Sequence, residues 1–168
     1  MMDINTWQEA LKIYDMQECN VAVTLSTRRS VNGSLKSDFD IDLGYRKFIN
    51  MLSRKILGRN KGTIKNICFR EYGTVKRLHL HSMLQLPDQY LTSLDITIDM
   101  LQKVWAKQHI AYTKTKQHYS SDNKPKTIIV SARDFHAERI YDNQGWFNYC
   151  CKNRFSIDKV VNIAATYK

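Results

Sequence analysis

Residues 63–86 read TIKNICFREYGTVKRLHLHSMLQL and carry the clearest structural signal in the chain. Apolar and polar residues alternate through 63–72 and again through 76–86, and a short turn at Gly73 and Thr74 separates the two runs. Alternation with a period of two places one set of side chains on each face of a strand, and two such runs around a tight turn are typical of a β-hairpin. The sequence therefore predicts two antiparallel strands here.

Other strands are expected on both sides of this hairpin. Residues 20–27 (NVAVTLST) alternate and are rich in β-branched side chains, so that Val21, Val23 and Leu25 lie opposite a second, more polar row. Residues 110–119 and 126–132 resemble two more strands around the polar loop SSDNKP. Five strands in all are expected.

Four stretches show the 3.6-residue period of an amphipathic helix. They are residues 5–16, 40–57, 92–107 and 143–154. The second is backed by basic residues and ends at Gly58, and Gly145 weakens the first turn of the last one. With helices interspersed among paired strands, the expected class is α+β: a largely antiparallel five-stranded sheet with helices packed on it, in a ferredoxin-like arrangement.

Length and composition favour a single domain over residues 1–168. The chain has 43% apolar residues, enough for a buried core, which excludes wholesale disorder. Its formal net charge is +10, which favours a nucleic-acid partner but also fits a solvated basic surface. We find no signal peptide or membrane segment, and the four scattered cysteines suggest reduced thiols, so we expect a cytoplasmic protein, or a nuclear one in a eukaryotic host, with no membrane partner.

A candidate metal site lies on the hairpin. His79 and His81 are two residues apart on one strand and therefore share a face, and Glu71 on the neighbouring strand can lie beside them. Two imidazoles and one carboxylate suit a divalent ion, Mn²⁺ or Mg²⁺, with the nitrogen ligands favouring Mn²⁺; zinc also accepts these ligand types. Taken alone, the two histidines are a weak motif and are better explained as exposed strand residues; the neighbouring Glu71 is what favours a metal site.

The three remaining histidines, His109, His118 and His136, have no comparable spacing, and we interpret them as ordinary polar residues.

A second candidate lies in GWFNYCCKNR, residues 145–154. Tyr149 and Lys152 are three residues apart and share a helix face with Trp146. A nearby cation favours the phenolate form of tyrosine, and a divalent metal can polarise a phosphodiester that the phenolate attacks. On its own this spacing arises easily by chance, in which case the pair is a packed aromatic and a surface cation.

In order and content, these three motifs resemble the HUH endonuclease superfamily, in particular the single-tyrosine replication initiators of rolling-circle plasmids, phages and small circular single-stranded DNA viruses. The first motif of that family resembles NVAVTLST, the second is His-hydrophobic-His, here His79 to His81, and the third is YxxK, here Tyr149 to Lys152. The likeness covers residues 20–154. The first motif is loose, and two cysteines occupy the middle of the third.

The resemblance implies a function and a role for each residue. Glu71, His79 and His81 would hold the divalent ion against the scissile phosphate, Tyr149 would attack it to give a 5′-phosphotyrosine link, and Lys152 would assist positioning or charge balance. The partner would be single-stranded DNA at a replication origin, including an origin folded into a hairpin. No phosphate-binding loop of the GxxxxGK[ST] type is present, so a host helicase and polymerase are expected partners.

Binding single-stranded DNA requires cations for the phosphates and aromatic faces for the bases. The candidates are clustered basic residues, each of which is individually also consistent with solvated surface. They are Arg28, Arg29, Arg46, Lys47, Arg54, Lys55, Lys114 and Lys116.

Two other functions remain open from the sequence. A single-tyrosine transposase or a small relaxase would share the same motifs. A non-catalytic nucleic-acid-binding α+β module would use strand aromatics to stack bases, although the RNA-recognition signature is absent.

Overall fold

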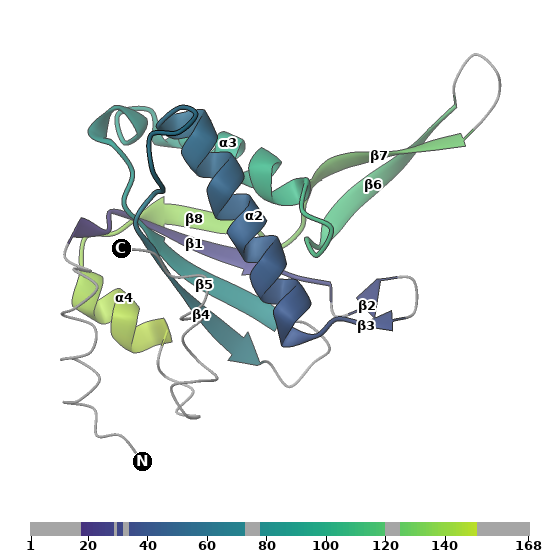
Figure 1. Ribbon diagram of the computed structural model, residues 1–168, viewed down its shortest axis with the longest axis horizontal. Helices are drawn as coiled ribbons and strands as arrows, with labels where there is room; N and C mark the ends of the chain where they lie inside the picture. Colours follow the sequence, from purple (N-terminus) through teal and green to yellow (C-terminus); the bar gives the residue numbers. More distant parts are fainter. Residues whose placement is uncertain (1–17, 29, 32–33, 73–77, 120–124, 151–168) are drawn as a thin grey trace.

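The computed structural model describes residues 18–28, 30–31, 34–72, 78–119 and 125–150, and the chain belongs to the α+β class (Figure 1). Its centre is an antiparallel sheet. In spatial order the strands are β4 (Asn66–Tyr72), β5 (Leu78–Leu84), β1 (Val21–Ser26) and β8 (His136–Arg139). Each neighbouring pair is antiparallel, which confirms the hairpin expected within residues 63–86 and the strand expected at 20–27.

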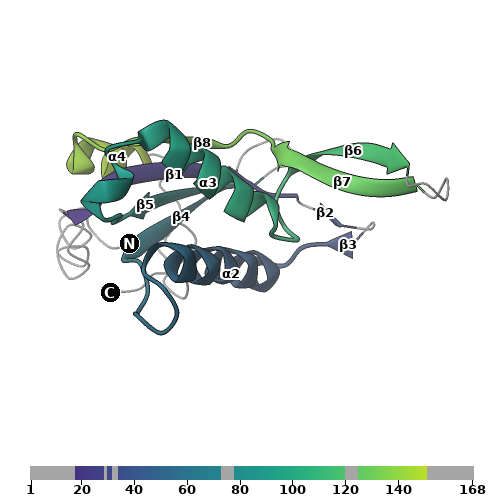
Figure 2. The ribbon, with the colours of Figure 1, turned by 90° about the horizontal axis from the view of Figure 1, so that it is seen from above.

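Helices cover both faces of this sheet. α2 (Asp38–Ile56) and α3 (Leu94–Ala106) pack with Val21, Val23 and Leu25 in one apolar cluster. α4 (Asn143–Cys150) packs in a second cluster on the opposite face, and Figure 2 shows α2 and α4 on different sides of the sheet.

The helices expected at 40–57 and 92–107 are therefore confirmed. α2 begins two residues earlier than expected because Ser37 and Asp40 form a capping box. The helix expected at 143–154 is confirmed through Cys150, and its remainder lies outside the described residues. The helix expected at 5–16 lies outside them entirely.

Two of the five strands expected in the central sheet, at 110–119 and 126–132, are not part of it in the described ranges, and the unexpected β8 is its fourth strand. β6 (Thr113–Tyr119) and β7 (Pro125–Ala132) pair with each other in a separate two-stranded sheet that projects from the body (Figure 1). Lys114, Thr115, Lys116, Gln117 and Thr127 are exposed along these strands. Among the side chains described on these two strands, only Thr113 and Ala132 at the base of the hairpin are buried, and Ile129 of β7 is 49% exposed. The rest of the hairpin therefore gains little from burial.

Strand β8 was not expected from the sequence. Its four residues read HAER, and only Ala137 is buried. A short edge strand with one buried residue lacks the alternation by which strands are recognised. The remaining elements are a small hairpin, β2 (Ser30–Val31) with β3 (Ser34–Leu35), and a 3₁₀ turn, η2 (Asp88–Tyr90).

A polar link under the sheet joins α2 to β4 and β5. Tyr45 is fully buried; its hydroxyl donates to Asn66 Oδ1 (2.9 Å) and also contacts the Ser82 hydroxyl. Burial raises the pKa of Tyr45 well above its usual range. The folded protein therefore holds this phenol neutral at a pH where an unfolded chain ionises it.

We predict that the free energy of unfolding falls as pH rises above about 10, the pKa of an unperturbed tyrosine, toward the raised pKa of folded Tyr45. Below pH 10 the contribution is fully present. Tyr45→Phe should flatten this decline by up to about 1.4 kcal/mol per pH unit, measured by urea unfolding between pH 8 and 11. Tyr141→Phe is the control, because Tyr141 is 88% exposed; equal slopes in Tyr45→Phe and wild type would contradict the prediction.

Candidate active site

The two histidines of β5 lie on the sheet face that α4 partly covers. In the strand register His79 is opposite Glu71 of β4 and Ser26 of β1, and His81 is opposite Thr24 of β1. Residues directly opposite in an antiparallel pair point to the same face. The sheet therefore brings together the three side chains of the metal site expected from the sequence.

His81 is held from both neighbouring strands. Its Nε2 lies 2.6 Å from Glu71 Oε2, and its Nδ1 lies 3.1 Å from Thr24 Oγ1. The His81 side chain is only 4% exposed, whereas that of Glu71 is 22% exposed. Since a carboxylate only accepts, Nε2–H is the donor to Glu71, and in the neutral ring Nδ1 accepts the Thr24 hydroxyl proton.

The tautomer of His79 follows from its neighbour. Ser26 donates its one hydroxyl proton to the carbonyl oxygen of Asp134 (3.1 Å). The hydroxyl oxygen of Ser26 also lies 3.0 Å from His79 Nδ1. Ser26 must therefore accept from Nδ1–H, and in the neutral ring Nε2 carries the lone pair. In metal sites, a histidine that binds the ion through one ring nitrogen is oriented by a hydrogen bond from the N–H of its other ring nitrogen.

The donor atoms of Glu71, His79 and His81 are of types that bind a divalent metal, but the distances between them do not yet fit one ion. Within the described ranges, no three His, Cys, Asp or Glu side chains are grouped closely enough to hold an ion. Two ligands at right angles, each about 2.1 Å from an ion, lie about 3.0 Å apart. The 2.6 Å contact between Glu71 and His81 must lengthen before both can bind one ion. Glu71, His79 and His81 remain the side chains that could hold it.

Helix α4 brings Tyr149 to the histidines. Phe147 and Cys150 are buried against the sheet, and the Phe147 ring contacts Phe69 with 5.7 Å between centroids. Tyr149 then lies edge-to-face with His81, at 5.6 Å between ring centroids and 89° between planes. Trp146, one turn earlier, contacts both rings, at 6.3 Å from His81 and 5.4 Å from Tyr149.

Tyr149 is accessible to a large substrate. Its side chain is 47% exposed, and it lines an open hollow of about 550 Å³ together with Thr24, Trp146, His136 and Glu138. His136 lies opposite Thr24 in the register, and its Nε2 is 3.7 Å from Glu138 Oε2. The sequence interpretation treated His136 as an ordinary polar residue, because the strand that carries it was not recognised.

Thr24 and Ser26, which orient the two histidines, were also missed as site residues. The signal was present in NVAVTLST, where the hydroxyl residues occupy alternate positions on one face of a strand. Only the pairing of this strand with β5 gives those hydroxyls a role. Lys152 of the expected YxxK motif lies outside the described residues.

The basic residues expected to bind DNA fall into two groups. Arg28 and Lys114 lie at the base of the β6–β7 hairpin, where Arg28 Nη2 donates to Thr113 Oγ1 (2.6 Å), and Lys116 is exposed further along β6. Four others belong to α2, which packs on the sheet face opposite α4, and Arg29 lies outside the described residues. The four on α2 are Arg46, Lys47, Arg54 and Lys55.

Comparison with known protein families, with curated proteins and with solved structures finds no match for this chain. In the described part of the chain, no helix combines the length and apolar character needed to cross a membrane. The function of the site has to be inferred from its own geometry and chemistry.

The position of Tyr149 depends on the start of α4. Asp142 caps this helix, because its Oδ1 accepts from Gly145 N (2.8 Å) and its carbonyl accepts from Trp146 N (3.1 Å). A Cβ at Gly145 would lie 2.4 Å from Asp142 Oδ2, so glycine leaves room for the cap.

We predict that Asp142→Ala lowers the free energy of unfolding by about 1 kcal/mol, the usual cost of losing an N-cap side chain. Asp142→Asn should stay within a few tenths of a kcal/mol of wild type, since asparagine caps about equally well. Urea unfolding measures both. Equal losses in the two variants would show that charge, rather than capping, is what Asp142 contributes.

Proposed function

We propose that this protein nicks and rejoins single-stranded DNA at a replication origin by tyrosyl transesterification, and so initiates rolling-circle replication. The observation that carries the proposal is the contact between Tyr149 and His81, whose centroids are 5.6 Å apart while His81 is bonded to Glu71. An accessible phenol beside a histidine–carboxylate pair is an arrangement suited to attack on a phosphodiester.

The reaction is balanced without an external energy source. The phenolic oxygen of Tyr149 forms a bond to phosphorus, the bond from phosphorus to the 3′ oxygen breaks, and the proton lost by the phenol is matched by one gained by the 3′ hydroxyl. The 5′-phosphotyrosine link keeps the energy of the phosphodiester. Attack by a 3′ hydroxyl reverses the step and rejoins the strand.

Glu71, His79 and His81 would hold Mn²⁺ or Mg²⁺, which when bound polarises the scissile phosphate as a Lewis acid. Thr24 and Ser26 orient the two imidazoles. Lys152, three residues after Tyr149 in the sequence, would balance the charge of the phenolate.

The order of elements supports an assignment to the nuclease fold of the HUH superfamily. Without the β2–β3 and β6–β7 hairpins and the 3₁₀ turn, the order is β1, α2, β4, β5, α3 and β8, followed by α4. The first six elements have the β-α-β-β-α-β order of ferredoxin-like folds. In this proposal a fifth strand is not required by the site, because Glu71, His79, His81 and Thr24 all lie on β4, β5 and β1.

The proposed function implies protein partners from the host and a cellular compartment. Opening of the duplex at the origin would come from a host helicase or from supercoiling, and extension of the 3′ end from a host polymerase. The protein would act in the cytoplasm of a bacterial host, or in the nucleus of a eukaryotic one.

We predict a covalent adduct between the protein and labelled single-stranded origin DNA in the presence of Mn²⁺. It should survive boiling in detergent, because the phosphotyrosine link is covalent, and gel electrophoresis would detect it. Tyr149→Phe should abolish the adduct, since only the attacking oxygen is removed.

Tyr90→Phe is the matched control, because Tyr90 lies on η2 outside the site, and it should form the adduct normally. An adduct that persists in Tyr149→Phe would assign the nucleophile to another residue. DNA binding by wild type with no adduct under any condition would favour the non-catalytic binding module.

We further predict that Glu71→Gln and His81→Ala each reduce cleavage at least about 100-fold, since they remove a metal donor. DNA affinity should change by less than about threefold, because most affinity comes from contacts with phosphates. Single-turnover cleavage and fluorescence anisotropy measure the two effects separately.

Asp99→Asn is the control, because Asp99 is an exposed acid on α3, which packs on the sheet face opposite the site. Equal losses of cleavage and of binding in Glu71→Gln would contradict the assignment of Glu71 to the metal.

A further inference from the structure

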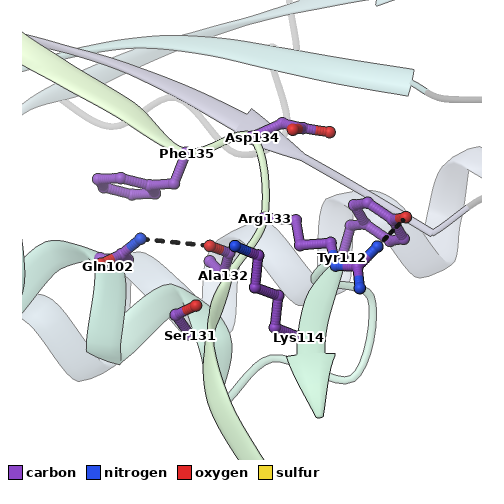
Figure 3. A pocket seen from close by; sticks show the side chains of 8 residues that line it. All are labelled: Gln102, Tyr112, Lys114, Ser131, Ala132, Arg133, Asp134 and Phe135. Atoms are coloured by element: carbon purple, nitrogen blue, oxygen red, sulfur yellow. Dashed lines mark hydrogen bonds between the residues drawn. The ribbon is translucent and has the colours of Figure 1, made fainter.

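A second hollow, of about 460 Å³, lies at the base of the β6–β7 hairpin (Figure 3). Lys114 of β6 and Arg133, just after β7, contribute cations to its lining, and Tyr112 contributes an aromatic ring. Asp134 is the acidic residue of the lining, and Figure 3 shows its carboxylate turned away from Lys114. The hollow is therefore suited to an anion.

Arg133 is fixed in place before any ligand arrives. Its Nη1 donates to the Tyr112 hydroxyl (3.0 Å), and its guanidinium carbon lies 5.2 Å from the centroid of the same ring. On the backbone, Arg133 N donates to the Tyr112 carbonyl (2.7 Å). A guanidinium held in this way loses less conformational entropy when it binds an anion.

The opposite wall is equally well anchored. Gln102 of α3 donates from Nε2 to the Ala132 carbonyl (3.2 Å), which ties the helix to the end of β7 (Figure 3). Arg28 adds a third cation close by, because it donates to Thr113, the residue next to Lys114.

This hollow is connected to the candidate active site through one residue. Asp134 lines the hollow, and its carbonyl accepts the hydroxyl proton of Ser26, whose oxygen accepts from His79. The turn that carries Arg133 therefore also orients a histidine of the site.

The cations continue outward from the hollow along the hairpin. Lys114 and Lys116 are both exposed on β6, and Lys116 is two residues further along the strand from the hollow. A row of cations that leads from a pocket suits a polyanion better than a single ion.

We infer that the hollow binds a backbone phosphate of the single-stranded DNA, at a position separate from the phosphate that is cleaved. Lys114 and Arg133 are its ligands, and Tyr112 positions Arg133. The inference rests on the proposed function, because it takes DNA as the substrate, and it assigns the hairpin base as the site that sets the register of the strand on the protein.

The test replaces the phosphates of a single-stranded oligonucleotide one at a time by an uncharged linkage. A set of otherwise identical single-stranded oligonucleotides carries one methylphosphonate at successive positions, and binding is measured by fluorescence anisotropy in a Tyr149→Phe background, where no cleavage is expected. One position, or two adjacent ones, should weaken binding about fivefold, the effect of one good charge pair. In Lys114→Ala or Arg133→Ala, neutralising that position should have no further effect.

Lys61→Ala is the matched control, because Lys61 is an exposed lysine in the connection between α2 and β4, and both ribbon views show that connection away from the hairpin. It should keep the full sensitivity of wild type at that position. Lys114→Ala should also reduce the slope of log affinity against log salt concentration by about 0.7, the value for one lost contact to a single strand.

The outcomes separate the inference from the proposed function. If wild type forms the covalent adduct but Lys114→Ala and Arg133→Ala keep the sensitivity of wild type at every linkage, the inference is overturned and the function stands. If the scan identifies the position but wild type forms no adduct, the subsite stands and the nicking function fails. Competition by inorganic phosphate at the same concentration of phosphate groups as the oligonucleotide would show a site for free phosphate instead, and would also overturn the inference.

Discussion

The hydrogen bond between His81 and Glu71 is the interaction on which the candidate site depends. It joins two neighbouring strands through a side chain that is only 4% exposed, where a lost partner would leave a polar group without solvent. The same imidazole lies within hydrogen-bond distance of Thr24 on β1 and against the ring of Tyr149 on α4. The β4–β5 hairpin, β1 and α4, which are far apart in the sequence, therefore meet at one ring.

The main apolar core and the candidate site lie on opposite faces of the central sheet. On one face, α2 and α3 bury a continuous apolar cluster in which Trp105 packs edge-to-face on Phe48. On the other face, α4 has eight residues and is anchored through Phe147 and Cys150. This short helix buries Phe147 and Cys150 against the sheet and leaves Tyr149 47% exposed, at a hollow that Thr24 also lines.

The β6–β7 hairpin gives the site a second contact region. Its strands project from the body with most of their described side chains exposed, and the chain returns to the sheet through Arg133 and Asp134 (Figure 1). One backbone turn thus presents a cation to the hollow at the hairpin base and a carbonyl to Ser26. The same segment links a surface suited to phosphate with the orientation of His79.

Local periodicity in the sequence was sufficient to determine the antiparallel hairpin, the two long helices, the shared face of His79 and His81, and the spacing of Trp146 and Tyr149. It could not determine that β8 joins the sheet, that β6 and β7 leave it, or that His136 lies beside Thr24. A repeat of two or 3.6 residues reports which side chains share a face of one element. Which elements become neighbours depends on strand register and on the burial of residues far apart in the chain, and only the tertiary structure decided those.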